Sequence, residues 1–179
     1  MATRSREQIL AFGDLVESRS TALLRLAYGV VGDYQLAQDL LQEALVKVYV
    51  AWPRLRSRSA AEVYARRTIV TTAISWRRRR SFHEPPVETV PDSVSDLDED
   101  DWFTTHDVLW QHVRRLPPRQ RAALVLRYYE DLSEAETADL MGCSTGTVKS
   151  QLSAALSKLR ERVGPETGVL FPENQAVAR

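Results

Sequence analysis

The most informative stretch of the sequence runs from Ser133 to Val163 and has the pattern of two helices joined by a short turn. Ser133 and Glu136 have the spacing of a capping box, in which each side chain binds the other residue's backbone N–H where a helix begins. Gly142 tolerates the positive φ angle of a tight turn, and Ser144 can cap the next helix. The stretch therefore predicts a helix-turn-helix.

The second of these helices has two contrasting faces. Apolar residues recur at spacings of three and four and predict a buried face, made of Val148, Leu152, Leu156, Leu159 and Val163. The opposite face carries small hydroxyls and cations: Thr145, Thr147, Lys149, Ser150, Ser153 and Lys158. No carboxylate precedes Glu161, so this helix suits the major groove of DNA. The alternative is a helical hairpin with a solvated face, but such a face normally mixes glutamate with lysine.

A basic segment in the first half is a second candidate for anion binding. Residues 54–80 contain nine arginines and one acidic residue, Glu62. Four of the arginines are consecutive: Arg77, Arg78, Arg79 and Arg80. They point all round a helix, so some must meet an anion or solvent, and phosphates are the obvious partner. Trp76 beside them can stack on an unpaired base. The alternatives are core packing for Trp76 and a solvated helix end for the arginines.

Three polar residues of the first half, Asp39, Gln42 and Glu43, lie three and four positions apart. In a helix they share one face, away from the apolar stripe that contains Leu36, Leu40 and Leu45. A plain solvated face is the commonest role for such residues, and the spacing alone does not exclude it.

The sequence contains no catalytic constellation. His83, His106 and His112 lack a metal-ligand spacing, and Cys143 has no sequence partner. No P-loop, G-x-S-x-G motif or Rossmann fingerprint is present. We therefore expect a protein that is not an enzyme and has no cofactor and no metal site.

The cellular compartment follows from cysteine usage and hydropathy. The single cysteine excludes an internal disulfide and fits a reducing cytosol. The first residues lack the apolar core of a signal peptide. No stretch approaches the roughly 18 apolar residues that a membrane span needs. We expect a cytoplasmic protein with no membrane span.

Helical periodicity predicts an all-α fold. Three helices are expected over about residues 7–31, 34–51 and 60–81. Gly32 and Asp33 separate the first two, and Pro53 ends the second. The apolar residues assigned to the third helix are Val63, Ile69, Val70 and Ile74. Helical pattern resumes at about residue 108, and the Pro117-Pro118 pair opens a further helix before the helix-turn-helix.

These helices are expected to form two small domains. Residues 1–83 make the first and 108–163 the second. Residues 84–107 carry nine acidic residues and no Lys or Arg, with three prolines, which is typical of an acidic flexible linker. Residues 164–179 are expected to form a flexible tail.

Three segments of the second half carry a family resemblance. They are Leu116 to Arg121 (LPPRQR), Tyr128 to Ser133 (YYEDLS) and Thr147 to Ser150 (TVKS). Over about fifty residues they strongly resemble region 4 of the extracytoplasmic-function (ECF) sigma factors of the sigma-70 family. The resemblance implies that this domain reads the −35 promoter element through Thr145, Thr147, Lys149, Ser150 and Ser153. It also implies docking on the β flap of RNA polymerase.

The first half is similar to region 2 of the same family. Asp33 to Trp52 resembles region 2.2, which implies that Asp39, Gln42 and Glu43 grip the β′ clamp of the polymerase core. Tyr64 to Arg67 and Ser75 to Arg80 resemble regions 2.3 and 2.4. This implies that Thr71, Trp76, Arg77, Arg78, Arg79 and Arg80 act in −10 recognition and melting. The family commonly has Asn at the position of Thr71, which leaves the −10 specificity open. The loop Arg54 to Ala60 corresponds to the segment that captures a flipped −10 base, with no reading residue identified.

The sequence thus predicts a sigma factor that binds RNA polymerase core and directs initiation at promoter DNA. It would recognise the −35 and −10 elements and assist melting. The strong bias toward arginine over lysine hints at a GC-rich, actinobacterial source. A regulator of the LuxR kind would instead carry an α/β receiver or ligand domain ahead of the helix-turn-helix. A protein-binding adaptor leaves Arg77 to Arg80 unexplained. Whether an anti-sigma factor restrains the protein stays open, as do its promoter sequence and stimulus.

Overall fold

The computed structural model describes residues 2–80, 107–164 and 171, and every regular element in these ranges is helical. The N-terminal half consists of α1 (Ala2–Val31), α2 (Tyr34–Ala51), the 3-10 turn η1 (Trp52–Arg54) and α3 (Arg58–Arg80). The C-terminal half consists of α4 (Asp107–Arg114), α5 (Pro118–Leu124), the π-helical turn η2 (Val125–Tyr129), α6 (Glu134–Met141) and α7 (Thr145–Val163). The all-α prediction is confirmed.

Local signals set the boundary between α1 and α2 as predicted. Gly32 has a φ angle of 72°, which an L side chain rarely adopts, and it ends α1. The carboxylate of Asp33 accepts a hydrogen bond of 2.9 Å from the Leu36 N–H and caps α2. Pro53 lies in η1 just after α2. The second helix has the predicted bounds, while α1 and α3 begin earlier than predicted.

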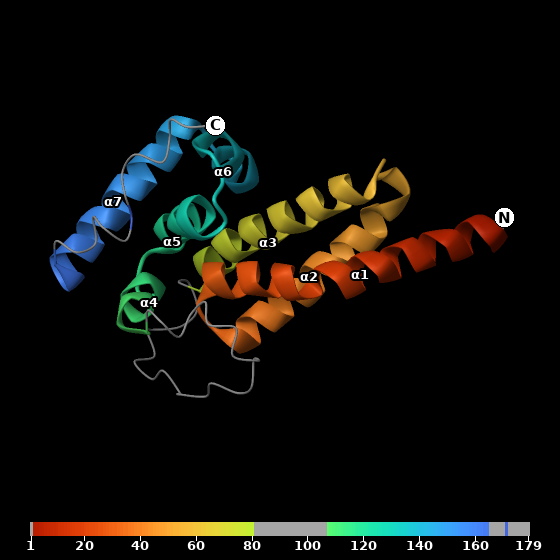
Figure 1. Ribbon diagram of the computed structural model, residues 1–179, viewed down its shortest axis with the longest axis horizontal. Coiled ribbons are helices and arrows are strands. Elements are labelled where there is room, and N and C mark those ends of the chain that lie inside the picture. Colours follow the sequence, from red (N-terminus) through yellow and green to blue (C-terminus); the bar gives the residue numbers. More distant parts are fainter. Residues whose placement is uncertain (1, 81–106, 165–170, 172–179) are drawn as a thin grey trace.

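The three long helices pack against one another in every pair, as Figure 1 shows in red, orange and yellow. Their shared core contains fully buried aliphatic side chains: Leu15, Leu26, Leu40, Val48, Ile69 and Val70. Not every apolar residue of α3 belongs to this core. Val63 is 58% exposed, because the buried stripe of α3 runs through Ala61, Ala65 and Ile69.

In the C-terminal half, α7 packs on α4, α5 and α6. Its buried face is Val148, Leu152, Ala155, Leu156 and Leu159, so the predicted apolar stripe is confirmed except that Val163 is only half-buried. Between α5 and α6 the chain widens into a π-helical turn, in which the Glu130 N–H donates to the Val125 carbonyl at 3.0 Å. The sequence pattern did not predict this turn.

The two halves lie against each other in one continuous core, with α5 and α6 between α7 and the three long helices (Figure 1). The side chain of Arg121 is only 3% exposed at this interface. Its Nε donates to the Val30 carbonyl at 2.7 Å, and one terminal nitrogen donates to the Arg114 carbonyl at 2.6 Å. One guanidinium therefore bonds the backbone of both halves.

Two predicted segments fall largely outside the described residues. Of the acidic linker predicted over residues 84–107, only Asp107 is described, and it begins α4. Of the tail predicted over 164–179, Gly164 and Phe171 are described. The Phe171 ring is 3% exposed and lies 5.1 Å, centroid to centroid, from the ring of Tyr128.

The contacts of Arg121 lead to a stability prediction. Arg121→Met leaves buried carbonyl groups without a donor, which is expected to lower the free energy of unfolding by about 1–3 kcal/mol. Urea unfolding followed by circular dichroism measures this loss. Arg119→Met, on the exposed side of the same helix, is the control and is expected to change little. Equal stability of the two variants would show that Arg121 contributes nothing.

Candidate nucleic-acid interface

The helix-turn-helix is built by the capping interactions that its sequence predicts. The Ser133 hydroxyl accepts from the Glu136 N–H at 3.2 Å, and the Glu136 carboxylate accepts from the Ser133 N–H at 2.8 Å. The Ser133 hydroxyl and then its N–H, as donors to this carboxylate, hold the pKa of Glu136 below its ordinary value. Gly142 ends α6 with a φ angle of 62°. Ser144 caps α7 by accepting from the Thr147 N–H at 3.2 Å. The capping box and the turn are confirmed.

The polar face of α7 is mostly open to solvent. Thr145, Lys149, Ser150 and Ser153 are exposed, while Thr147 and Lys158 are half-buried. Two of the hydroxyls already have partners within the helix. The Thr147 hydroxyl lies 2.9 Å from the Ser144 hydroxyl, and Ser150 donates to the Thr147 carbonyl at 2.9 Å. These two residues therefore support the first turn of α7 as well as facing outward.

The two lysines of α7 lie on opposite flanks of this face. They are nine residues apart, which is two and a half helical turns. Lys149 lies 3.5 Å from the carboxylate of Glu134 at the start of α6, and its side chain is 66% exposed. An exposed ion pair of this kind is weak, so the Lys149 ammonium can leave the Glu134 carboxylate and bind another anion.

The residues predicted to act on the −10 element follow α3 toward its C-terminus. Thr71 is half-buried, and its hydroxyl donates to the Arg67 carbonyl at 2.8 Å. Trp76 is half-buried and packs against the core. Part of the Trp76 side chain therefore packs in the core, as one of the two roles considered for it requires. Arg77 to Arg80 complete α3, but their side chains lie outside the described ones.

A shallow hollow of about 440 Å³ lies between the loop before α3 and the first turns of that helix. Its lining is Leu55, Ser59, Ala60, Val63, Tyr64 and Arg67. The sequence analysis identified the loop, but it did not identify Val63 or Tyr64 as lining residues of a hollow. The available signal was their position in the helix: both lie away from the stripe of Ala61 and Ala65, which are fully buried.

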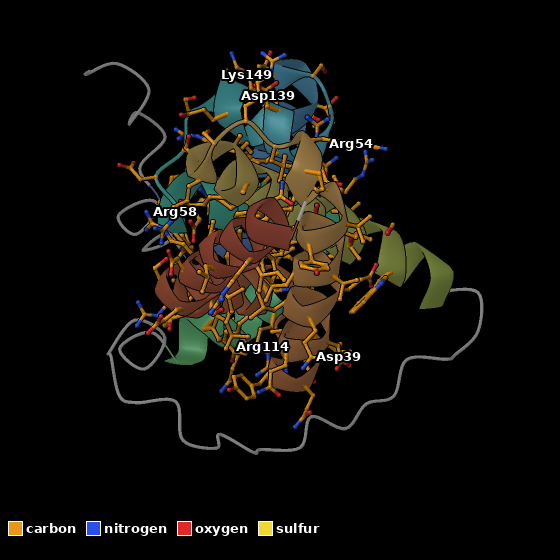
Figure 2. All side chains as sticks on the ribbon, turned by 90° about the vertical axis from the view of Figure 1, so that its right-hand side faces the viewer. Asp39, Arg54, Arg58, Arg114, Asp139 and Lys149 are labelled. Atoms are coloured by element: carbon orange, nitrogen blue, oxygen red, sulfur yellow. The ribbon has the colours of Figure 1, made fainter. Side chains whose placement is uncertain are left out.

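Asp39, on the polar face of α2, and Lys149, in the second turn of α7, lie toward opposite ends of the view in Figure 2. Asp39 and Gln42 are exposed. Glu43 is half-buried and accepts from the Lys47 ammonium at 2.6 Å, and that ammonium also lies 3.3 Å from the Thr72 hydroxyl of α3. The three predicted residues share one side of α2, but Glu43 is tied to α3 through Lys47.

The same side of α2 continues into exposed valines that the sequence analysis did not identify. Val46 and Val50 follow Asp39 and Glu43 at helical spacing and are 62% and 74% exposed. Exposed aliphatic residues beside a carboxylate are typical of a protein-binding surface rather than a nucleic-acid-binding one.

The described part of the chain contains neither a metal site nor a membrane span. No group of three or more His, Cys, Asp or Glu side chains there is arranged to hold a metal ion. No described helix combines the length and the apolar character needed to cross a bilayer.

A three-helix half with an arginine-rich third helix, followed by a helix-turn-helix with a carboxylate-poor outer face, defines a helical transcription initiation factor of the sigma class. Comparison with protein-family models agrees. Residues 15–83 match Sigma-70 region 2, and residues 106–159 match Sigma-70, region 4. The RNA polymerase sigma-E factor of Streptomyces avermitilis is 40% identical over 156 residues, covering 87% of each chain. The chain belongs to the sigma-70 family and, within it, to the ECF sigma factors.

More distant matches also cover most of the chain. The ECF RNA polymerase sigma factor SigM of Mycobacterium tuberculosis is 29% identical over 86% of this chain and 78% of its own. The sigma factor RpoE of Bartonella quintana, solved in complex with the anti-sigma factor NepR, has a similar fold. Its TM-score is 0.58 at 21% identity, over 93% of this chain and 99% of that one. The protein is a sigma factor for promoter-specific transcription initiation, in a non-catalytic family whose members bind RNA polymerase core and promoter DNA.

Proposed function

We propose that α7 reads the −35 promoter element with its polar face. The exposed, carboxylate-poor side of this helix supports the proposal most directly. Its contributing residues are Thr145, Thr147, Lys149, Ser150, Ser153 and Lys158. A helix lying in the major groove has a phosphate backbone on each side. Lysines on opposite flanks are therefore suited to the two strands, while the hydroxyls between them face base edges.

The −10 element is assigned to α3 and the loop before it. Arg77 to Arg80 would bind phosphates, Thr71 would contribute to recognition, and Trp76 would stack on the unpaired state. The hollow beside Tyr64 and Val63 has an aromatic and an aliphatic wall next to Arg67, which suits an unstacked base and its phosphate.

The polymerase core is assigned to α2. Asp39 and Gln42, with Glu43 beside them, would bind the β′ clamp, and the exposed valines extend that surface. The C-terminal half would also dock on the β flap. The protein would act in the cytoplasm, have no enzyme activity, and use no cofactor. An anti-sigma factor is a further proposed partner, since one protein of similar fold was solved with one.

Run-off transcription with core polymerase tests this function. The purified chain should direct initiation at promoters selected from a random pool, and DNA binding without initiation would reject it. Asp39→Arg is expected to weaken core binding at least tenfold, because it reverses the charge in the centre of the proposed surface. Glu17→Arg makes the same change on the exposed side of α1 and should bind core normally. Equal binding by the two variants would remove α2 from the proposal.

The two lysines of α7 give a prediction about −35 binding. Lys149→Ala and Lys158→Ala should each weaken binding about equally for all sequences, and each should reduce the salt slope by about one. Ser150→Ala should instead change the preference at single bases, by about 1–3 kcal/mol. Glu134→Gln is expected to tighten binding slightly, because it removes the carboxylate that competes for Lys149. Fluorescence anisotropy at several salt concentrations measures the DNA binding of all four variants. A uniform loss in Ser150→Ala would show that its hydroxyl reads no base.

Trp76 gives a prediction about promoter opening. Trp76→Ala should leave the closed complex nearly intact and reduce the open complex by the value of one base–aromatic stack, about 1–3 kcal/mol. The loss should be small on a template already mismatched across the start site. Trp76→Phe keeps an aromatic ring and should retain most of the opening. Permanganate reactivity of unpaired thymines measures promoter opening, and circular dichroism checks that the variants fold. An equal loss on the mismatched template would exclude a role in melting.

A further inference from the structure

We propose that Arg58 is a positioning residue for −10 recognition, because its guanidinium fixes the start of α3, and the loop before it, to α1. These segments form one wall of the hollow assigned to an unpaired base, so the inference rests on the proposed function and deepens it. It requires that Arg58 bonds α1, that this contact sets the place of the loop, and that the hollow depends on that place.

The guanidinium of Arg58 bonds two groups of α1. One terminal nitrogen donates to the Asp14 carbonyl at 2.9 Å and also to the Ser18 hydroxyl. The Ser18 hydroxyl itself donates to the Asp14 carbonyl at 2.6 Å, so the three groups bond one another in pairs. Both acceptors belong to one turn of a regular helix, and the guanidinium therefore meets a fixed pair of partners. Although Arg58 is one of nine arginines in residues 54–80, it is directed toward α1 rather than toward the hollow.

A second contact joins the same two helices one turn further along α3. The Glu62 carboxylate lies 3.1 Å from Nε of Arg19, and both side chains are partly exposed. Residues four apart share one side of a helix, so Arg58 and Glu62 both face α1. Because Ser18 and Arg19 are consecutive, the two contacts also fall on the same turn of α1. Each helix thus contributes one arginine to the junction.

Bonds within the loop and the first turn of α3 fix their local shape but not their place on the molecule. The Ser57 hydroxyl accepts from the Ala60 N–H at 3.1 Å and lies 2.9 Å from the Ser59 hydroxyl. These partners are three and two residues apart, whereas Arg58 bonds a carbonyl 44 residues earlier in the chain. The contact of Arg58 therefore sets where the loop lies relative to α1.

The hollow depends on the place of this wall. Leu55 lines it from the loop, Ser59 and Ala60 line it from the first turn of α3, and the other lining residues follow on the same helix. Ser59 is adjacent to Arg58 and about 100° around the helix, so a shift of Arg58 also moves Ser59. A site that discriminates between ligands has to hold its contacting groups within about 0.5 Å. A wall that is held before binding also loses less entropy when the base enters.

Base discrimination by the complete complex of the protein with core polymerase tests the proposal. The probes are fork-junction DNAs with a single-stranded −10 element, in which each position is varied in turn. Arg58→Met keeps the length of the side chain but removes its donors, so the preference at one position should fall about fivefold, as for a weak base contact. Binding of a probe that lacks the base at that position should not change. Arg6→Met removes the same charge from the exposed start of α1 and should discriminate like the parent.

The salt dependence of binding distinguishes positioning from a direct phosphate contact. In Arg58→Met the salt slope should stay that of the parent, because no contact to DNA is removed. Loss of a phosphate contact would instead lower the slope by about one for every probe. A lower slope with unchanged discrimination therefore overturns the proposal.

A substitution on α1 approaches the same contact from its other side. Ser18→Ala removes one acceptor without altering the loop, and it should reduce discrimination less strongly than Arg58→Met. The double variant should lose no more than Arg58→Met alone, since both substitutions break one contact. If circular dichroism shows that Arg58→Met does not fold, Ser18→Ala decides the test. Unchanged discrimination in both variants overturns the proposal, whereas a parent complex without any base preference would reject the function proposed for the hollow.

Discussion

The contact between the two halves of the molecule depends on the C-terminal end of α1. A helix ends with carbonyl groups that have no partner within the helix and carry a partial negative charge. Here the buried guanidinium of Arg121 binds one of them, at Val30. Gly32 ends the helix and leaves space for that guanidinium, because a Cβ at this position would lie 3.2 Å from a terminal nitrogen of Arg121. A side chain at Gly32 would therefore strain the backbone and require the neighbouring Arg121 to shift by a few tenths of an ångström.

The sequence predicted the parts of this fold that depend on short-range signals. Asp33, Ser133 and Ser144 each cap the helix that follows them, and each was recognisable from its residue type and position. The same holds for the polar face of α7, because in a regular helix the spacing of residues in the sequence fixes the side of the helix on which each residue lies. Apolar residue type alone does not identify the buried face of α3. Val63 is 58% exposed, whereas the fully buried Ala65 belongs to the contact surface.

The packing of the two halves could not have been predicted in this way. Arg121 bonds a carbonyl 91 residues earlier in the chain, and Arg66 pairs with a carboxylate 64 residues later. Neither spacing corresponds to a local pattern, and a segment rich in carboxylates between the halves favours independent domains. The burial of Phe171 is a similar case, since its partner Tyr128 belongs to a π-helical turn that hydrophobic periodicity does not reveal. Family resemblance identifies the two domains but not how they contact each other.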